Sequence, residues 1–574
     1  MTWFGLPQPT TCDFTEGAWK PRNLIALHFD NYPGYAREAE RLCTDLDTLG
    51  YRTQTYSDAD AYSEGEGALS RIYLRYRPPN IRIQLGSDAL EMPKNCAPQT
   101  MITPTPGTKL SVESEAKESL PWQLRESFEI CVDEDALEIR AASAEGIFRG
   151  CCQILQNLQA KGSVPRGIAQ FVPAVRERGW HLDAARKYFS AAWIKQEIIA
   201  GARLGLNYFQ WHFSENEGFR IESPTGYHSR QHLTRAEVRD ILRVAADYYV
   251  TVVPSLDMPG HMGSVLENFP QYRLAHSGAR GKVAAKLEAG ALNICDETAR
   301  NFAFGLVADF MEMFPPGPWH LGGDEFVDFT QMDRYPELAE YARSRFGEGA
   351  SPFDALTDFV NQIASHLLEH GYEPRVWNDG MLRGSLPLSP RVAIAWWTNW
   401  HPQMAPLQRA LDGGYQVVNF HDSLLYYVLG EKAGYRYPTA EKLWEADWHP
   451  GLFPKGANIT PTFEPTPIAG RAPATDYANI TGRADITGHS VFATPPVLED
   501  SSGSAVLTQN EVATVRAYPP QLRGAYFSIW CDEDAQSSSE ISRGIRRFRA
   551  AFAERAYRGG SNLSITEFDQ MLLE

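Results

Sequence analysis

From Val172 onward the chain alternates short apolar segments with amphipathic segments of helical spacing. Continued over about 375 residues, this alternation is typical of an α/β protein whose eight strands and helices form a (β/α)8 TIM barrel with insertions. The eight predicted strands are Arg178–Asp183, Asn207–Phe213, Thr251–Leu256, Trp319–Gly322, Arg375–Asn378, Val392–Trp396, Gln416–Phe420 and Tyr526–Trp530. The predicted helices include Ala191–Leu204, Thr234–Tyr249, Asn301–Phe314 and Pro352–Glu369. The second of them opens with Thr234-Arg-Ala-Glu237, which predicts a capping box. Residues that follow the strands should meet at one face of the barrel.

The first 172 residues have a different pattern, which predicts a smaller α+β domain before the barrel domain at 173–574. Phe128–Val132 and Ala136–Arg140 flank three acidic residues and predict a β-hairpin. Further elements are predicted as strands at Asn23–His28 and Asn80–Leu85 and as helices at Tyr35–Leu49 and Ala144–Leu158.

One long segment of the predicted barrel domain does not fit the alternation of strands and helices. Residues 448–520 are rich in Pro, Gly, Thr and Ala. The segment is too long for a plain loop, so we expect an insertion or lid near the eighth strand.

Composition excludes several classes of partner. The net charge of −17 and the lack of a basic patch argue against nucleic acid and anionic membranes. No apolar run approaches the roughly 18–20 residues of a membrane span. The N-terminus shows no signal peptide, and the eight cysteines have no CxxC spacing. We therefore expect a cytoplasmic protein with reduced thiols, although secretion after removal of a leader stays open.

Asp324 and Glu325 are the clearest candidates for reactive groups in the sequence. They follow Gly322-Gly323 directly after a predicted strand. Two carboxyl groups held close together do not ionise independently, which suits glycosidic bond cleavage. The alternative is an ordinary solvated surface pair. Because neighbours on a strand face opposite sides, both can face one substrate only if the backbone leaves strand geometry at the two glycines.

Three motifs carry a resemblance to a known family. They are Arg178-Gly-x-x-Leu-Asp-x-x-Arg186, Asp257-Met-Pro-Gly-His261 and His320-Leu-Gly-Gly-Asp-Glu325. In order and spacing the chain resembles the family 20 glycoside hydrolases, which comprise β-N-acetylhexosaminidases and lacto-N-biosidases. The resemblance runs from Arg178 to Asp532, and residues 141–150 are similar to the family's accessory domain. It implies a TIM barrel preceded by that domain.

The resemblance also implies catalytic roles. In such enzymes the 2-acetamido oxygen of the sugar attacks C1 and forms an oxazolinium ion. Glu325 would protonate the leaving oxygen and later deprotonate water. Asp324 would accept the acetamido N–H while ionised. Tyr426, favoured over Tyr427, would hydrogen-bond the acetamido oxygen.

Substrate-binding roles are implied for five further residues. Trp377, Trp397 and Trp530 resemble the aromatic walls around the sugar, with barrel-core packing as the alternative. Arg178 matches an arginine that grips sugar hydroxyls, or else is a buried salt-bridge partner. Asp532 stands where many relatives have a glutamate, one methylene longer.

Supporting residues and two departures complete the predicted site. Asp257 and His261 would support Glu325, and Glu215 would replace the usual aspartate partner of the histidine. Val428 stands where many relatives carry a second sugar-binding carboxylate. No metal and no cofactor is expected.

The sequence thus predicts an exo-acting retaining β-N-acetylhexosaminidase. Its partners would be oligosaccharides or glycoconjugates with a terminal N-acetylhexosamine, with no nucleic acid and no membrane, and the oligomeric state stays unknown. Three alternatives remain: a lacto-N-biosidase-like enzyme that releases a disaccharide, a catalytically silent sugar-binding protein, and a two-carboxylate glycosidase with Asp379 or Asp532 as nucleophile.

Overall fold

The computed structural model describes residues 2–57, 70–76, 83–85, 88–90, 120–223, 226–275, 278–399, 403–430, 433–454, 477–479 and 518–572. They form two compact units. The first includes residues up to Arg176 and the C-terminal stretch from Tyr557, and the second runs from Glu177 and includes Pro519–Ala556. Among the described residues no helix is both long and apolar enough to cross a membrane.

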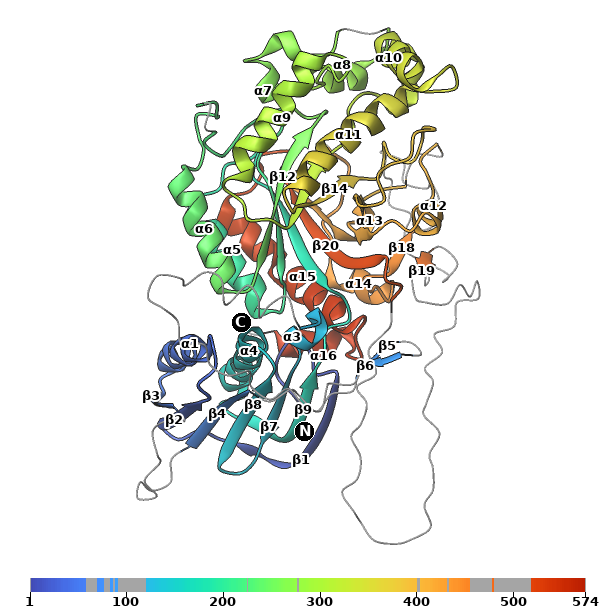
Figure 1. The fold of residues 1–574 in the computed structure, drawn as a ribbon. Coiled ribbons are helices and arrows are strands. Elements are labelled where there is room, and N and C mark those ends of the chain that lie inside the picture. Colours follow the sequence, from blue (N-terminus) through green and yellow to red (C-terminus); the bar gives the residue numbers. More distant parts are fainter. Residues whose placement is uncertain are drawn as a thin grey trace, which may run out of the picture. The chain divides into compact units, whose positions relative to one another are not determined.

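A seven-stranded mixed sheet forms the first unit (Figure 1), in the order β1-β9-β7-β8-β4-β2-β3. The strands are β1 (Thr11–Trp19), β2 (Leu24–Phe29), β3 (Arg52–Ser57), β4 (Ser70–Tyr76), β7 (Phe128–Val132), β8 (Ala136–Ala141) and β9 (Val164–Phe171). The helices are α1 (Tyr35–Thr48), α3 (Trp122–Glu126), α4 (Ala144–Lys161) and α16 (Ile565–Met571). The predicted β7–β8 hairpin is confirmed as an antiparallel pair. Of the predicted strand at Asn80–Leu85, only β5 (Ile83–Leu85), which pairs with β6 (Asp88–Leu90), lies within the described residues.

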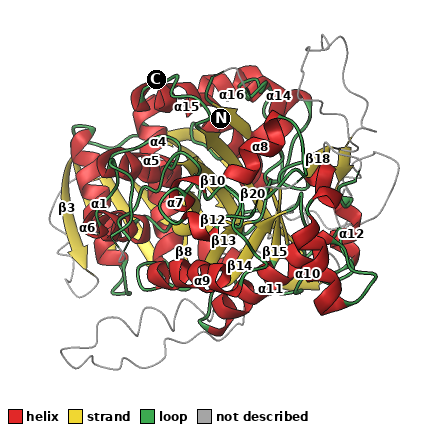
Figure 2. Cartoon of the chain, turned by 90° about the horizontal axis from the view of Figure 1, so that it is seen from above, coloured by secondary structure: helices red, strands yellow, loops and turns green. Residues whose placement is uncertain are grey.

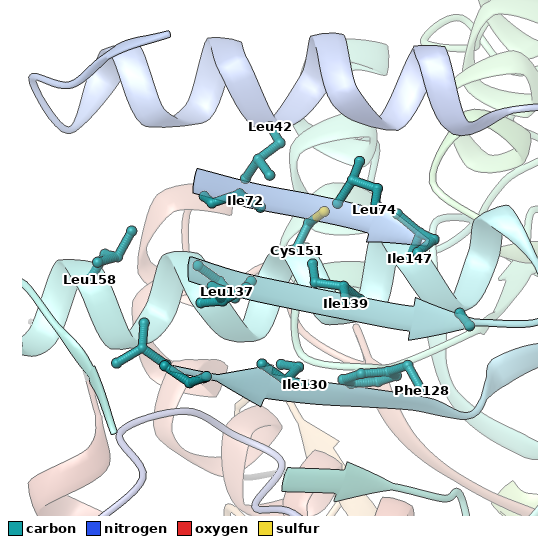
Figure 3. Packing of buried hydrophobic residues seen from close by; sticks show 14 of the residues in the cluster. Leu42, Ile72, Leu74, Phe128, Ile130, Leu137, Ile139, Ile147, Cys151 and Leu158 are labelled. Carbon is teal, nitrogen blue, oxygen red and sulfur yellow. The ribbon is translucent and has the colours of Figure 1, made fainter. Parts of the chain in front are cut away.

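Apolar side chains of α1 and α4 pack on one face of this sheet. Leu42 and Ile147 are fully buried with Ile72, Leu74 and Ile139 of the central strands (Figure 3). Each CH2 group buried in such a core contributes about 0.8 kcal/mol.

The C-terminal stretch belongs to this first unit as well. Tyr557 is buried in the same cluster, and its carbonyl accepts the backbone N–H of Ala174 at 2.7 Å. This grouping corrects the prediction that all residues after 172 form one domain, because the chain returns to the first core at its end.

Eight parallel strands close the barrel of the second unit through the β10–β20 pairing. They are β10 (Glu177–Asp183), β11 (Tyr208–His212), β12 (Thr251–Met258), β13 (Pro318–Gly322), β14 (Glu373–Trp377), β15 (Ala393–Trp396), β16 (Val417–Asn419) and β20 (Leu522–Trp530). The short strand β17 (Tyr426–Val428) also pairs with β20. The predicted (β/α)8 barrel is therefore confirmed.

Helices surround these strands, as Figures 1 and 2 show. They are α5 (Ala191–Arg203), α6 (Arg235–Asp247), α7 (Gly263–Leu266), α8 (Lys282–Ala289), α9 (Glu297–Met311), α10 (Pro336–Phe346), α11 (Pro352–Glu369), α12 (Leu407–Asp412), α13 (Asp422–Leu425), α14 (Ala440–Glu445) and α15 (Ser538–Arg558). The capping box at Thr234 and Glu237 is present at the start of α6. Of the predicted insertion at 448–520, β18 (Leu452–Pro454) pairs with β19 (Tyr477–Asn479), and most of the remainder lies outside the described residues.

A buried ionic network fills the barrel at the amino ends of its strands. Glu177 accepts hydrogen bonds from Arg375 at 3.0 and 3.2 Å, from Arg523 at 2.6 Å and from Tyr526 at 2.7 Å. Burial opposes its ionisation, but the two guanidinium groups outweigh burial and lower the pKa of Glu177 to about 2. The network thus joins β10, β14 and β20 through charge.

We predict that Glu177→Gln destabilises the protein by about 3–5 kcal/mol at pH 7, because Arg375 loses its buried partner. A carboxylate with a depressed pKa stabilises the fold above its ordinary value, and that stabilisation is lost as pH falls through the folded pKa. The difference between wild type and variant should therefore shrink from pH 4.5 toward pH 2. Urea unfolding at several pH values measures it. Asp240→Asn, at an exposed surface pair, is the control and should change the free energy of unfolding little.

Candidate active site

The turn after β13 carries the two adjacent carboxylates. Gly322 and Gly323 have φ angles of 80° and 89°, and Glu325 has a φ of 40°. The predicted departure from strand geometry is therefore present. A Cβ atom on Gly322 would lie 1.4 Å from Oδ1 of Asp257, so this position accepts only glycine. The turn directs both carboxylates to one histidine: Nε2 of His261 lies 3.6 Å from Asp324 Oδ2 and 3.5 Å from Glu325 Oε2.

His261 connects this pair to a second charged group. Its Nδ1 lies 2.9 Å from Oε1 of Glu215, which also contacts Nη2 of Arg186 at 2.5 Å. Arg186 in turn contacts Asp183 at 2.9 Å. The ends of β10, β11, β12 and β13 thus contribute to one continuous ionic network.

Burial and charge set the protonation of this network. Burial and the neighbouring Asp257 carboxylate raise the pKa of Asp324 well above its ordinary value, although His261 opposes them. Desolvation favours the protonated form of Glu325, but the hydrogen bond and charge of His261 outweigh it and lower the pKa of Glu325. Burial opposes the charge of His261, yet Glu215 and Asp324 raise the pKa of this histidine well above its usual value. These surroundings favour the neutral form of Asp324 and the ionised form of Glu325.

Asp257 lies against the turn after β13 that carries Asp324 and Glu325. Its side chain is buried, its backbone N–H donates to Ser214 Oγ at 3.1 Å, and burial raises its pKa to about 8 despite the opposing charge of His261. Asp257 is thus a neutral group that adjoins Asp324 near pH 7.

An aromatic cluster lines the next part of the site. Tyr426 lies 5.7 Å from Trp530 and 6.2 Å from Trp397, to which it is parallel within 3°. Trp377 is fully buried and lies 6.2 Å from Trp530. The structure therefore brings the three predicted tryptophans together with Tyr426.

Tyr427 points to a different environment. Its hydroxyl donates to Gln536 at 3.2 Å and its ring stacks on Tyr437 at 4.5 Å. Successive residues of β17 face opposite sides, so only Tyr426 can share the cluster with Trp397 and Trp530.

The structure does not bring Arg178 to the predicted site. Arg178 is the second residue of β10, and Asp183 ends the strand about 16 Å away at about 3.3 Å per residue. Its Nε donates to the carbonyl of Gly205 at 3.0 Å, and its side chain is fully buried. Arg186, the second arginine of the same motif, is the residue at the site. Its position just beyond the end of a predicted strand was the available signal.

Asp532 lies at the edge of this network. Its side chain is 37% exposed and its Oδ1 is 3.9 Å from Arg186 Nη1, while the Arg186 guanidinium lies 5.5 Å from the Trp530 ring. Arg186 and Asp532 can therefore both offer polar groups beside the aromatic cluster.

Sequence reasoning also missed Asp422 and Tyr435. The Tyr435 hydroxyl donates to Asp422 Oδ2 at 3.0 Å, and its ring packs 5.8 Å from Tyr426. Asp422 is the first residue of α13 and precedes Tyr426 in the sequence, whereas in the family pattern the sugar-binding carboxylate follows the tyrosine. No signal in the sequence joined Asp422 to Tyr435.

One group of side chains meets the distance requirement of a metal site. Ligand atoms of His212, Glu215 and Asp257 lie within 4.8 Å of one another. The Glu215 carboxylate, however, already contacts two cationic side chains, Arg186 and His261. These cations disfavour a metal ion at the same position.

We predict that Gly322→Ala destabilises the protein by about 2 kcal/mol or more, because a Cβ there overlaps Asp257 and the φ is left-handed. Gly305→Ala on α9 is the matched control, since a Cβ there meets no atom within 4 Å. That change should be neutral or slightly stabilising. Urea unfolding of both variants measures the difference, and equal free energies of unfolding would contradict the steric argument.

Part of the chain matches known sugar-cleaving proteins in sequence. Residues 177–449 match the catalytic domain of glycosyl hydrolase family 20. The chain is 28% identical over 344 residues to the lacto-N-biosidase of Bifidobacterium bifidum, across 59% of this chain and 29% of that protein. It is 25% identical over 375 residues to a beta-hexosaminidase of Porphyromonas gingivalis, across 61% and 43% respectively. The alignments therefore span less than half of the length of these two relatives.

Solved structures share the fold. The Flavobacterium johnsoniae chitobiase superposes with a TM-score of 0.65 at 17% identity, over 99% of this chain and 71% of that one. The beta-N-acetylhexosaminidase of Streptomyces coelicolor gives 0.61 at 16%, over 99% and 94%. The motifs, the barrel and the family match thus agree over residues 177–449, which are similar to the catalytic domain of glycosyl hydrolase family 20.

Proposed function

We propose that this protein is a glycoside hydrolase that removes terminal β-linked N-acetylhexosamine with retention of configuration. The observation that carries this proposal is the turn at Gly322-Gly323, which directs Asp324 and Glu325 to one side beside His261. The adjoining cluster of Trp377, Trp397, Trp530 and Tyr426 supports it, because aromatic faces pack well on sugar rings.

In the proposed first step the acetamido oxygen attacks C1 and the glycosidic bond breaks. Glu325 gives its proton to the leaving oxygen, and Asp324 accepts the acetamido N–H as positive charge develops. In the second step water attacks C1, Glu325 takes a proton from it, and the oxazolinium ring opens. Two displacements at C1 retain the configuration.

This mechanism requires the proton of the pair to move when substrate binds. The protein surroundings alone raise the pKa of Asp324 and lower that of Glu325. A bound sugar would donate its N–H to Asp324 and shield the 42% exposed Glu325 from water. Both effects favour an ionised Asp324 and a neutral Glu325.

Tyr426 and the tryptophans have positioning roles in this proposal. The Tyr426 side chain is 5% exposed, and its hydroxyl would donate to the acetamido oxygen and fix the direction of attack. Arg186 and Asp532 would bind hydroxyl groups of the sugar. The two-carboxylate alternative is disfavoured for Asp379, since both of its oxygens accept hydrogen bonds from the protein.

Release of a disaccharide is the second candidate. It is supported by the similarity to a lacto-N-biosidase and by Val428, which replaces a carboxylate that many relatives use to hold sugar hydroxyls. Fewer contacts with those hydroxyls would suit a site that admits a further sugar.

Four 4-nitrophenyl substrates separate these candidates: the β-N-acetylglucosaminide, the β-N-acetylgalactosaminide, the β-glucoside and the β-lacto-N-bioside. Turnover of the N-acetylhexosaminides without the glucoside supports the main proposal. Turnover of the lacto-N-bioside alone would support disaccharide release. Turnover of the glucoside would contradict a substrate-assisted mechanism, and silence on all four would favour a sugar-binding protein.

We predict that Glu325→Gln lowers kcat for substrates with poor leaving groups by about 100-fold or more, because proton donation is lost. An activated aryl leaving group needs little protonation and should suffer much less. Steady-state kinetics with alkyl and dinitrophenyl N-acetylglucosaminides test this expectation. Equal losses on both substrates would exclude an acid role for Glu325.

We predict that Asp324→Asn lowers kcat for both substrate types by about 100-fold, because a neutral amide cannot stabilise the developing positive charge. The same two substrates, measured in parallel, distinguish this pattern from that of Glu325→Gln. Near wild-type activity would remove Asp324 from the mechanism.

A further inference from the structure

Asp379 is a buried carboxylate that the proposed mechanism does not use. It follows β14 in the sequence Trp377-Asn378-Asp379 and is 2% exposed. Its Oδ2 accepts the backbone N–H of Glu325 at 3.1 Å, and its Oδ1 accepts the indole N–H of Trp397 at 3.1 Å. One carboxylate therefore joins the catalytic turn after β13 to the aromatic wall after β15.

The residue before Asp379 fixes the same wall segment. Asn378 Oδ1 accepts the backbone N–H of Trp397 at 2.9 Å, and its Nδ2 donates to the carbonyl of Thr398 at 2.7 Å. Asn378 thus holds the backbone of Trp397, and Asp379 holds the nitrogen of its indole ring.

The catalytic turn needs such a support. Glu325 has a φ of 40°, in the left-handed region that a residue with a side chain adopts only at a conformational cost. The hydrogen bond from its N–H to the buried carboxyl group of Asp379 offsets part of that cost. No other hydrogen bond of this N–H is found among the described residues.

We propose that Asp379 is a positioning residue that holds the proton donor Glu325 and the wall residue Trp397 at a fixed separation. The inference rests on the proposed function, because it assigns Glu325 the acid role. It extends that function, because the position of Glu325 after β13 would then depend on a residue that follows the next barrel strand, β14. Misplacement of a catalytic group by about 1 Å can lower the rate about 100-fold.

The test compares Asp379→Asn and Asp379→Ala with Asp354→Asn. Asp354 is an equally buried aspartate on α11 that accepts backbone N–H groups from Ser351 and Leu386, outside the site. The Asp354 variant reports loss of stability alone, so its kcat and KM should stay close to wild type.

The first readout is kcat on aryl N-acetylhexosaminides of graded leaving-group acidity. We expect the Asp379 variants to lose about 10- to 100-fold in kcat on the poorest leaving group and much less on the best. Loss of the hold on Trp397 should raise KM for all substrates alike. Equal loss of kcat across the series, or kinetics like those of Asp354→Asn, would overturn the positioning role.

The second readout does not depend on activity. Hydrogen–deuterium exchange of the peptide that contains Glu325 should become faster in Asp379→Ala and stay unchanged in Asp354→Asn, because only the first change removes the acceptor of its N–H. Unchanged exchange in Asp379→Ala would overturn the proposal. An inactive wild type would refute the proposed function, and the exchange result would still decide whether Asp379 holds the turn.

Discussion

The site depends on how a dense group of acids is accommodated in a region of low dielectric constant. Asp183, Glu215, Asp257, Asp324 and Asp379 line the ends of the barrel strands, and all but Asp324 are buried to 2% exposure or less. Arg186 and His261 are the cations at their centre. Since two cations cannot neutralise all of these carboxylates, some acids retain protons instead, which is why the pKa of Asp257 is raised to about 8 and that of Asp379 to about 7 by burial.

This electrostatic constraint explains why the pKa values of the two adjacent carboxylates shift in opposite directions. Asp324, with 13% of its side chain exposed, adjoins other acids, so its neutral form is favoured. Glu325 is more exposed and is the acid that His261 keeps ionised. In the proposed mechanism, a substrate that supplies an N–H to Asp324 and shields Glu325 from water would reverse this preference, so that binding would prepare the acid.

The fold was predictable from the sequence because its signals are local. Strand–helix alternation and the capping box at Thr234 depend on nearest neighbours in the chain, and the structure confirms both. The strain at the catalytic turn was also predictable, since adjacent carboxylates after two glycines cannot face one side otherwise. By contrast, the motif alone does not show which of its two arginines reaches the site, because that depends on where each arginine lies along the strand. Arg186 lies beyond the end of β10, where barrel sites form, and Arg178 lies near its beginning.

Contacts between distant loops were not predictable in the same way. Asp379 and Glu325 are 54 residues apart, and their hydrogen bond exists only because β13 and β14 are neighbours in the barrel. The pair of Asp422 and Tyr435 is of the same kind. It contributes a carboxylate and a hydroxyl beside Tyr426, whereas Val428, two positions after that tyrosine, carries no polar group. In the proposed mechanism the turn that carries Asp324 and Glu325 would govern bond cleavage, and the aromatic wall next to Tyr426 would govern which sugar fits. Sequence changes at the wall would therefore alter the sugar specificity without altering the reaction class.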